Sequence, residues 1–255
     1  MQGGRGRHFL WRARNRWTEI SLQPKNRDMC GRFTQIYTWR EVHDALSLIG
    51  TNRNLPARYN VAPTDPVDVV VARGDKLELS MRRWGLVPGW WKKSLKEMPA
   101  TFNARAESIA EKPMFRTGFR HKRCVIPASG FYEWQTVEKI KQPYYFSARS
   151  GGPLWMAGVW DDWTDPVSAD TLLSCTIIVG EANRFVQPLH DRMPVLLDAS
   201  LVRSWIFNEM PHEELLRPAS NDLLQVWPVS TDVNRVGKMD DAHLIEAIGL
   251  NGPLI

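Results

Sequence analysis

The feature that most constrains the fold is a long succession of short strand-like runs with few helical segments between them. The runs are rich in β-branched and aromatic residues and are bounded by turn-forming residues. They lie at 67–71, 77–83, 131–134, 144–148, 154–159, 176–179, 193–197 and 224–229. This irregular succession of strands predicts an α+β fold around a mostly antiparallel, curved sheet.

A few helices accompany these strands. Thr38 and Glu41 form a capping-box pattern that predicts a helix running to about Gly50. Helical patterns return at 200–207, with Asp198 or Ser200 as the cap, and at 241–248. The chain has 255 residues, of which 43% are hydrophobic and 24% charged, so it can bury the core of one domain.

Several classes of protein are disfavoured by the sequence. No stretch approaches the roughly 18 consecutive apolar residues of a membrane span, and the N-terminus lacks the apolar segment of a secretory signal. The cysteines Cys30, Cys124 and Cys175 are odd in number and form no CxxC pair, so neither a disulfide framework nor a metal site is indicated. We therefore expect a cytoplasmic protein with reduced thiols.

Positive charge is concentrated in two segments. Residues 1–28 carry seven basic and two acidic side chains, which equals the net charge of +5 of the whole chain. Residues 82–123 carry eleven basic and three acidic side chains. The second segment is a candidate anion-binding surface, although a solvated basic face that binds nothing specific explains the charge equally well.

Tryptophans interrupt this basic segment. Three of the twelve, Trp84, Trp90 and Trp91, lie within it, and Pro88-Gly89 predicts a turn just before the Trp pair. Single-stranded nucleic acid is bound by cations along its backbone and by flat rings on which unpaired bases stack. Trp84 and one of the pair could equally belong to the core, and we expect at least one of Trp90 and Trp91 to be exposed.

Cys30 directly follows Met29, and this position has chemical consequences. A chain that begins at Cys30 carries a 1,2-aminothiol, with ordinary pKa values of about 7.7–8.0 for the amine and about 8.5 for the thiol. The amine can attack an aldehyde, and the thiol can then close a five-membered thiazolidine on the resulting imine. A ring-opened abasic site in DNA is such an aldehyde. On this residue alone, an ordinary buried cysteine is the simpler interpretation.

Three further positions carry candidate chemistry. His190 lies in a polar triplet between a turn and an apolar run, and imidazole is suited to proton transfer at neutral pH, although a lone histidine is more often structural. Glu133 lies within an otherwise apolar strand, so it is either outward-facing or a desolvated base with a raised pKa. Asn103, Arg105 and Glu107 alternate, which places them on one face if the segment is a strand.

Together these motifs resemble the SRAP (SOS-response-associated peptidase) family of abasic-site processing proteins. Six motifs occur in order: Cys30–Phe33, Arg58–Thr64, Trp84–Trp91, Asn103–Glu107, Arg123–Trp134 and His190–Pro194. Any one of them is weak, but six in order that span essentially all of residues 30–250 are specific.

The resemblance implies a single α+β domain with a barrel-like sheet, spanning 30–255, and a DNA groove that leads to Cys30. It implies that Cys30 is the crosslinking nucleophile and that Asn103, Glu133 and His190 surround the bound sugar. The nucleic-acid contacts that it implies are Arg32, Arg105 and Arg192, with Trp90 and Trp91 as a stacking platform. No cofactor and no metal are expected.

Two features depart from the family's pattern. Val179 stands where a threonine is expected, which removes one hydroxyl near the histidine loop. Residues 1–29 form a basic extension, and within a continuous chain the nitrogen of Cys30 is an amide that cannot form an imine. The extension resembles a transit peptide in composition or reads as disordered, so we expect either a true start at Met29 or removal of the extension by proteolysis.

The sequence thus predicts a monomer that crosslinks to abasic sites in single-stranded DNA through Cys30, with associated lyase and self-processing peptidase activity. It would act in the cytoplasm, at the nucleoid when bound to DNA. One alternative is a thiol protease or other hydrolase that uses Cys30 and His190. The other is a non-catalytic single-stranded DNA-binding protein that uses the Trp and Arg side chains alone.

Overall fold

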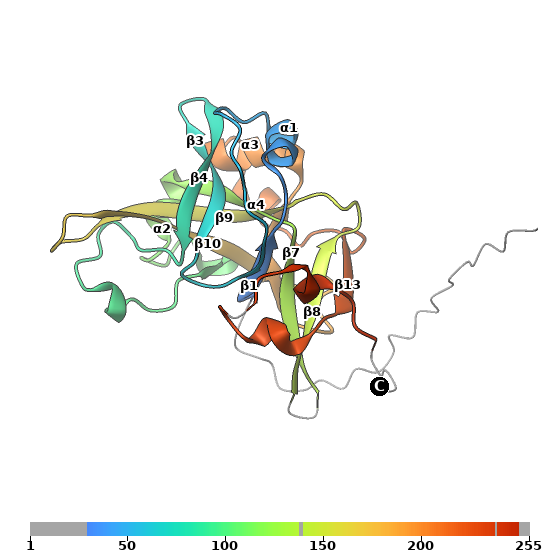
Figure 1. Cartoon of the computed structure of the whole chain (residues 1–255). Coiled ribbons are helices and arrows are strands. Elements are labelled where there is room, and N and C mark those ends of the chain that lie inside the picture. The colour runs from blue at the N-terminus through green and yellow to red at the C-terminus, as the bar shows by residue number, and fades with distance from the viewer. Residues whose placement is uncertain (1–29, 138–139, 238, 250–255) are drawn as a thin grey trace, which may run out of the picture.

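Strands dominate the computed structural model of the chain, which describes residues 30–137, 140–237 and 239–249 (Figure 1). The strands are β1 (Arg32–Gln35), β2 (Arg58–Val61), β3 (Pro66–Arg73), β4 (Lys76–Trp84), β5 (Asn103–Arg105), β6 (Arg123–Ala128), β7 (Gly130–Val137), β8 (Ile140–Ala148), β9 (Leu154–Thr164), β10 (Thr171–Glu181), β11 (Arg192–Pro194), β12 (Leu196–Leu197) and β13 (Leu224–Pro228). The α-helices are α1 (Trp39–Leu46), α2 (Arg116–His121), α3 (Ala199–Phe207) and α4 (His212–Leu215). The predicted α+β class is confirmed.

Five of the strands close into a barrel. The order β10-β4-β3-β6-β9 returns to its start because β9 also pairs with β10. All of these pairings are antiparallel except β10 with β4, where Cys175 lies opposite Trp84 in a parallel register. The curved, mostly antiparallel sheet that the sequence predicts is therefore a closed one.

A second sheet lies against the barrel, with the strand order β13-β8-β7-β1-β2. The chain passes from the barrel into this sheet at Ser129, between β6 and β7, and the backbone nitrogen of Ser129 donates to the carbonyl of Thr34 on β1. The stacked rings of Phe131 and Phe146, 4.9 Å apart, lie in the core between the sheets. In Figure 1 the strands β7, β8 and β13 lie to one side of β3 and β4.

Helices α1 and α3 lie together over one end of the barrel (Figure 1). The predicted capping box at Thr38 and Glu41 is present, and helix α1 ends at Leu46, because Ser47 adopts a left-handed conformation before Gly50 is reached. Helix α3 matches the predicted segment, with Asp198 as its N-cap. None of the helices in the described part of the chain has the length and apolar character that a membrane crossing needs.

Some local predictions were wrong. The helix predicted at 241–248 is only the 3-10 helix Ala242–Ile245, which ends where Glu246 becomes extended. Glu107 does not continue the strand of Asn103 and Arg105, because β5 ends at Arg105 and Ala106–Ser108 forms a 3-10 helix. Strands β1, β2 and β6 and helices α2 and α4 were not predicted from the sequence.

Closure of the barrel depends on a close approach at Gly158, where β9 lies between β6 and β10. A Cβ atom at this position would lie 2.6 Å from the carbonyl oxygen of Thr176 and 2.3 Å from Cδ1 of Ile126. The backbone oxygen cannot move without opening the β9–β10 ladder. The chain therefore requires glycine at this position.

We expect Gly158→Ala to lower the free energy of unfolding by about 1–3 kcal/mol or more, the cost of overpacking a rigid interior. Urea denaturation monitored by tryptophan fluorescence measures the change. Gly152→Ala is the matched control, because its added Cβ would meet only the Ser150 hydroxyl at 3.8 Å. Equal stability of the two variants would contradict the assigned role of Gly158.

Candidate functional site

The site is built around Cys30, which lies two residues before the start of β1 and is only 1% exposed. Its backbone nitrogen donates to Oε1 of Glu133 at 3.0 Å, and its carbonyl oxygen accepts from Nδ2 of Asn103 at 3.2 Å. Antiparallel pairing of β1 with β7 brings Glu133 beside Cys30, and β5 carries Asn103. The structure thus brings together three residues that the sequence singled out.

Glu133 is a buried carboxyl rather than an outward-facing one, with 1% exposure. Burial raises its pKa well above the ordinary value, the hydrogen bond from Cys30 opposes this, and the nearby charge of Asp191 raises it further. A carboxyl with a raised pKa is a stronger base near neutral pH than an ordinary glutamate. Of the two interpretations that the sequence allowed, the desolvated one is correct.

The thiol of Cys30 is held in its neutral form. Burial raises its pKa, and the adjacent Glu133 raises it further. Because the thiolate is the nucleophilic form of cysteine, this environment disfavours direct attack by sulfur. Cys124 and Cys175 are also buried and free.

His190 lies on the loop before β11 and is 5% exposed. Its Nδ1 lies 2.9 Å from the backbone nitrogen of Arg192, a group that can only donate, so Nδ1 accepts and the neutral ring carries its proton on Nε2. Nε2 is buried and has no hydrogen-bond partner in the described part of the chain. The neighbouring Asp191 is close enough to influence Glu133, which connects this loop to the Cys30 cluster.

The three arginines implied by the resemblance differ in their availability. Arg105 is exposed at the end of β5. Arg32 is half-buried, and its NH1 donates to Oδ1 of Asn60 at 2.8 Å and to the carbonyl of Val233 at 2.6 Å. Arg192 forms an ion pair with Glu107, so its guanidinium is partly occupied. Arg105 is the most accessible of them to an anion.

The tryptophans divide between core and surface. Trp84 is fully buried, whereas Trp90 is 47% exposed, which confirms the expectation that one of the Trp pair is exposed. Trp91 is partly buried, and its ring lies 6.0 Å from that of Trp90 at an angle of 58°. One indole face is therefore available at the end of the turn after Pro88.

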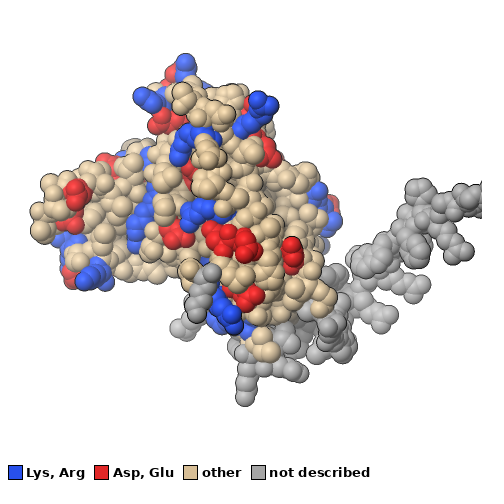
Figure 2. Space-filling view, viewed as in Figure 1, with Lys and Arg blue, Asp and Glu red and all other residues tan. Residues whose placement is uncertain are grey.

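The basic segment 82–123 is only partly a surface. Arg82 and Arg123 are buried, and Lys122 forms ion pairs with Asp161 and Asp162, so these three cations are not available to an anion. The exposed cations of the segment are Lys92, Lys93, Lys96, Arg105, Lys112, Arg116 and Arg120. On the face drawn in Figure 2, basic and acidic side chains are interspersed rather than gathered into one uniform patch.

Sequence reasoning missed the residues that support the site. Asn60 holds Arg32, and Asp191 acts on Glu133, through contacts between segments far apart in the chain. Asn60 lies within one of the six motifs, which is the only sequence signal that points to it. Asp161, which holds the tryptophan turn through Gly89, has no such signal.

Comparison with known proteins identifies the family of the chain. Residues 29–236 match the family described as SOS response associated peptidase (SRAP). The chain is 35% identical over 229 residues to "Abasic site processing protein YoqW" of Bacillus subtilis, covering 86% of this chain and all of that protein. It is 32% identical over 231 residues to "Abasic site processing protein YedK" of Escherichia coli, with the same coverage.

A solved structure has the same fold. A protein from Bacteroides thetaiotaomicron superposes with a TM-score of 0.76 at 22% identity, covering 86% of this chain and all of that one. The family match extends over most of the chain, and the relatives are matched over their whole length. This chain belongs to the SOS response associated peptidase (SRAP) family.

Proposed function

We propose that this protein forms a covalent thiazolidine crosslink with abasic sites in single-stranded DNA through the amine and thiol of Cys30. One observation carries the proposal: the nitrogen of Cys30 donates to the buried carboxyl of Glu133 at 3.0 Å. A carboxyl at this distance is within reach to take a proton from this nitrogen once the nitrogen is an amine. The names of the relatives from Bacillus subtilis and Escherichia coli supply the substrate class, abasic sites.

The chemistry proceeds in two bond-forming steps. In protein that begins at Cys30, the ammonium beside Glu133 favours the ionised carboxylate. Glu133 then accepts a proton from this ammonium, and the free amine adds to the C1′ aldehyde of the ring-opened sugar. Water leaves the resulting carbinolamine to give an imine: His190 Nε2 donates the proton that the departing oxygen needs and regains one from the nitrogen as the C=N bond forms. The thiol then adds to the imine carbon and its proton passes to nitrogen, which closes the thiazolidine. Asn103 fixes the position of Cys30 by binding its carbonyl oxygen at 3.2 Å.

A competing step accounts for the associated lyase activity. The imine acidifies the proton at C2′, so β-elimination and strand cleavage compete with ring closure. The thiol of Cys30 belongs to the same residue as the imine nitrogen, so its addition is intramolecular, and the ring closure protects the strand. All of these residues belong to one chain, and we propose that it acts on DNA as a monomer.

DNA would be held by Arg105 and by the exposed face of Trp90. A base stacked on an indole contributes about 1–3 kcal/mol, and such stacking requires an unpaired base. The exposed lysines that follow the Trp pair would attract the phosphate backbone. These features favour single strands over duplex DNA.

The rival functions are less well supported. A thiol hydrolase of the triad type needs a histidine that donates from Nδ1 to an acid. Nδ1 of His190 instead accepts from the backbone N–H of Arg192 at 2.9 Å, and Asp191 Oδ1 is farther away, at 3.5 Å. It also needs a thiolate, and the pKa of Cys30 is raised by burial. A passive DNA-binding protein has no use for a buried carboxyl beside the Cys30 nitrogen.

The direct test uses protein that begins at Cys30 and single-stranded DNA with one abasic site. We expect an adduct that survives denaturation and has the mass of protein plus DNA minus water, whereas intact DNA gives none. Cys30→Ser, matched in size, keeps the amine but lacks the thiol, so it should form only an imine that borohydride traps and should cleave more strands. An inert Cys30→Ser variant would contradict the role of the amine.

The active form must expose the nitrogen of Cys30. We propose that residues 1–29 are absent from that form, either because translation starts at Met29 or because they are removed. The full 255-residue chain with Met29→Ala, verified by mass, should bind single-stranded DNA but form no stable adduct, because an amide nitrogen is not nucleophilic. A stable adduct at Cys30 in this uncleaved chain would refute the aminothiol mechanism.

Glu133 should make stability depend on pH. The pKa of Glu133 is raised in the folded chain, so folding favours its neutral form. The contribution of this group to stability is fully present below the ordinary pKa of about 4.3 and is lost as the pH rises through the raised pKa. In the full chain, Glu133→Gln should therefore raise the Tm at pH 8 and leave it nearly unchanged at pH 4. In protein that begins at Cys30 it should slow crosslinking.

Calorimetry at the two pH values measures the difference in Tm. The exposed Glu246→Gln is the control and should show no such difference. A Glu133→Gln variant whose Tm responds to pH as the wild type does would show that the carboxyl is not held neutral by the fold.

A further inference from the structure

The turn that carries Trp90 and Trp91 is fixed to the barrel at three successive points. The backbone nitrogen of Val87 donates to the buried hydroxyl of Ser174 on β10 at 2.8 Å. That of Gly89 donates to Oδ2 of Asp161 on β9 at 3.0 Å. The carbonyl of Trp91 accepts from Nε1 of Trp163, also on β9, at 2.7 Å. The position of the exposed indole is therefore determined by three residues of β9 and β10 that are distinct from Cys30, Asn103, Glu133 and His190.

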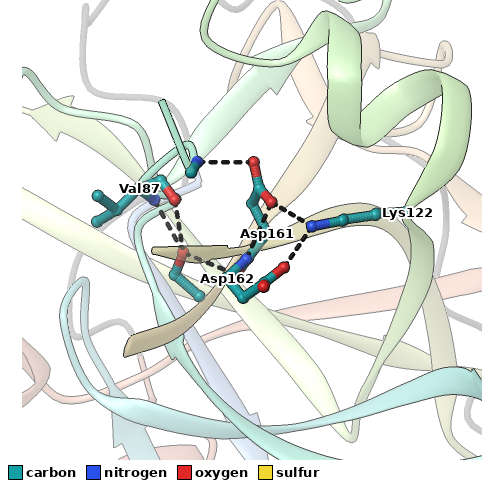
Figure 3. Close-up of polar contacts among 6 residues, drawn as sticks. Val87, Lys122, Asp161 and Asp162 are labelled. Carbon is teal, nitrogen blue, oxygen red and sulfur yellow. Dashed lines mark hydrogen bonds and ion pairs between the residues drawn. The ribbon is translucent and has the colours of Figure 1, made fainter. Parts of the chain in front are cut away.

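Asp161 is the central one of these three attachments (Figure 3). It is only 4% exposed, and both of its carboxylate oxygens are used. Oδ2 accepts from Gly89, whereas Oδ1 accepts from Nζ of Lys122 at 2.6 Å and from the backbone nitrogen of Asp162 at 3.0 Å. A buried carboxylate with all of these partners is held in one orientation, so the Gly89 nitrogen it binds is held as well.

Lys122 makes it possible for Asp161 to be buried. It lies at the end of α2, and in Figure 3 its side chain points between Asp161 and Asp162, with which it forms ion pairs. Burial alone would lower the pKa of Lys122, but the hydrogen bonds to the two carboxylates outweigh this and raise it. The cation thus remains charged and offsets the desolvation of Asp161.

The turn also approaches β9 so closely that only glycine fits. A Cβ atom at Gly89 would lie 2.9 Å from the carbonyl oxygen of Asp162 and 3.8 Å from Oδ1 of Asp161. Backbone oxygen in a paired strand cannot yield easily. Two independent features therefore keep the turn in the same place: the buried carboxylate of Asp161, which accepts from its backbone, and the close approach that the absence of a side chain at Gly89 allows.

We propose that Asp161, held by Lys122, is a positioning residue that presents Trp90 and Trp91 for stacking with unpaired DNA bases. The inference rests on the proposed function. Asp161 touches neither DNA nor the reacting atoms, and it acts only through the backbone of the turn. Its loss should weaken DNA binding without changing the chemistry at Cys30.

The test measures crosslinking by protein that begins at Cys30 as a function of the concentration of abasic single-stranded DNA. Asp161→Ala should raise the DNA concentration for half-maximal rate by about tenfold, within the roughly 5- to 150-fold expected for one lost base stack. The rate at saturating DNA should stay near that of the wild type. Asp165→Ala is the matched control, because Asp165 lies in the same hairpin but bonds only to its own turn, and it should behave as the wild type.

A second readout separates positioning from a general structural defect. The variants are also mixed with glyoxylate, a small aldehyde that needs no tryptophan platform, and thiazolidine formation at Cys30 is followed by mass spectrometry. Asp161→Ala should react with glyoxylate at the wild-type rate. A parallel loss of both reactions would overturn the proposal, because it would show that the substitution disturbs the Cys30 cluster.

Gly89→Ala keeps the test decisive if Asp161→Ala folds poorly, and a double variant tests whether Asp161 acts through Trp90. Gly89→Ala displaces the same turn but leaves Asp161 and Lys122 intact, so it should also weaken DNA binding. Adding Asp161→Ala to Trp90→Ala should raise the DNA concentration for half-maximal rate little beyond its value in Trp90→Ala alone, because the effects of two substitutions that act through one element are not additive. Full additivity, or wild-type affinity in Gly89→Ala, would overturn the proposal. If the wild type itself forms no adduct, the proposed function fails, a result that is distinguishable from all of these.

Discussion

Strand β10 is the element through which the barrel and the site are held together, because it pairs with four other strands. It closes the barrel by pairing with β9 on one side and β4 on the other. Further along, its parallel pairing with β5 places Asn103 opposite Ile177, and its antiparallel pairing with β11 places Arg192 opposite Glu181. One continuous strand thus determines where the amide of Asn103 and the loop of His190 lie, so a shift in its register would displace both from Cys30.

Val179 lies in the middle of this arrangement. It is fully buried in β10, opposite Arg105 on one side and Pro194 on the other, within the same apolar cluster as Cys30. A valine there contributes packing but no hydroxyl. The polar contacts that orient this side of the site are therefore made by Asn103 and by the backbone of the histidine loop.

Much of the fold could be predicted from the sequence because the signals are local. The capping box of α1 involves Thr38 and Glu41 alone, and each of the eight strand-like runs contains its own alternation or apolar core. Strand β6 was missed because all six of its residues are buried, which removes the alternation, and because it contains Pro127. The extended segment that follows Ile245 and the 3-10 turn at Glu107 depend on contacts outside their own sequence, so local patterns could not reveal them.

The candidate site was predictable in its members but not in its geometry. Cys30, Asn103 and Glu133 were recognisable from the order of motifs, but the residue that each one contacts lies 73 or 103 positions away. The contact between Gly89 and Asp161 spans 72 positions and involves a backbone nitrogen, which no sequence pattern records. Burial, which determines the raised pKa of Glu133, is likewise a property of the packed chain.

The distance in sequence between Cys30 and Glu133 also has a consequence for the order of events during synthesis. At about 5–20 residues per second, roughly 5–20 s pass between the addition of Cys30 and that of a residue 103 positions later. Throughout this interval the nascent chain lacks Glu133, the carboxyl that binds the Cys30 nitrogen in the folded chain. An enzyme that trims the chain at the ribosome would meet Cys30 while it is still open to solvent, whereas a cleavage that depends on Glu133 must wait until both sheets have closed.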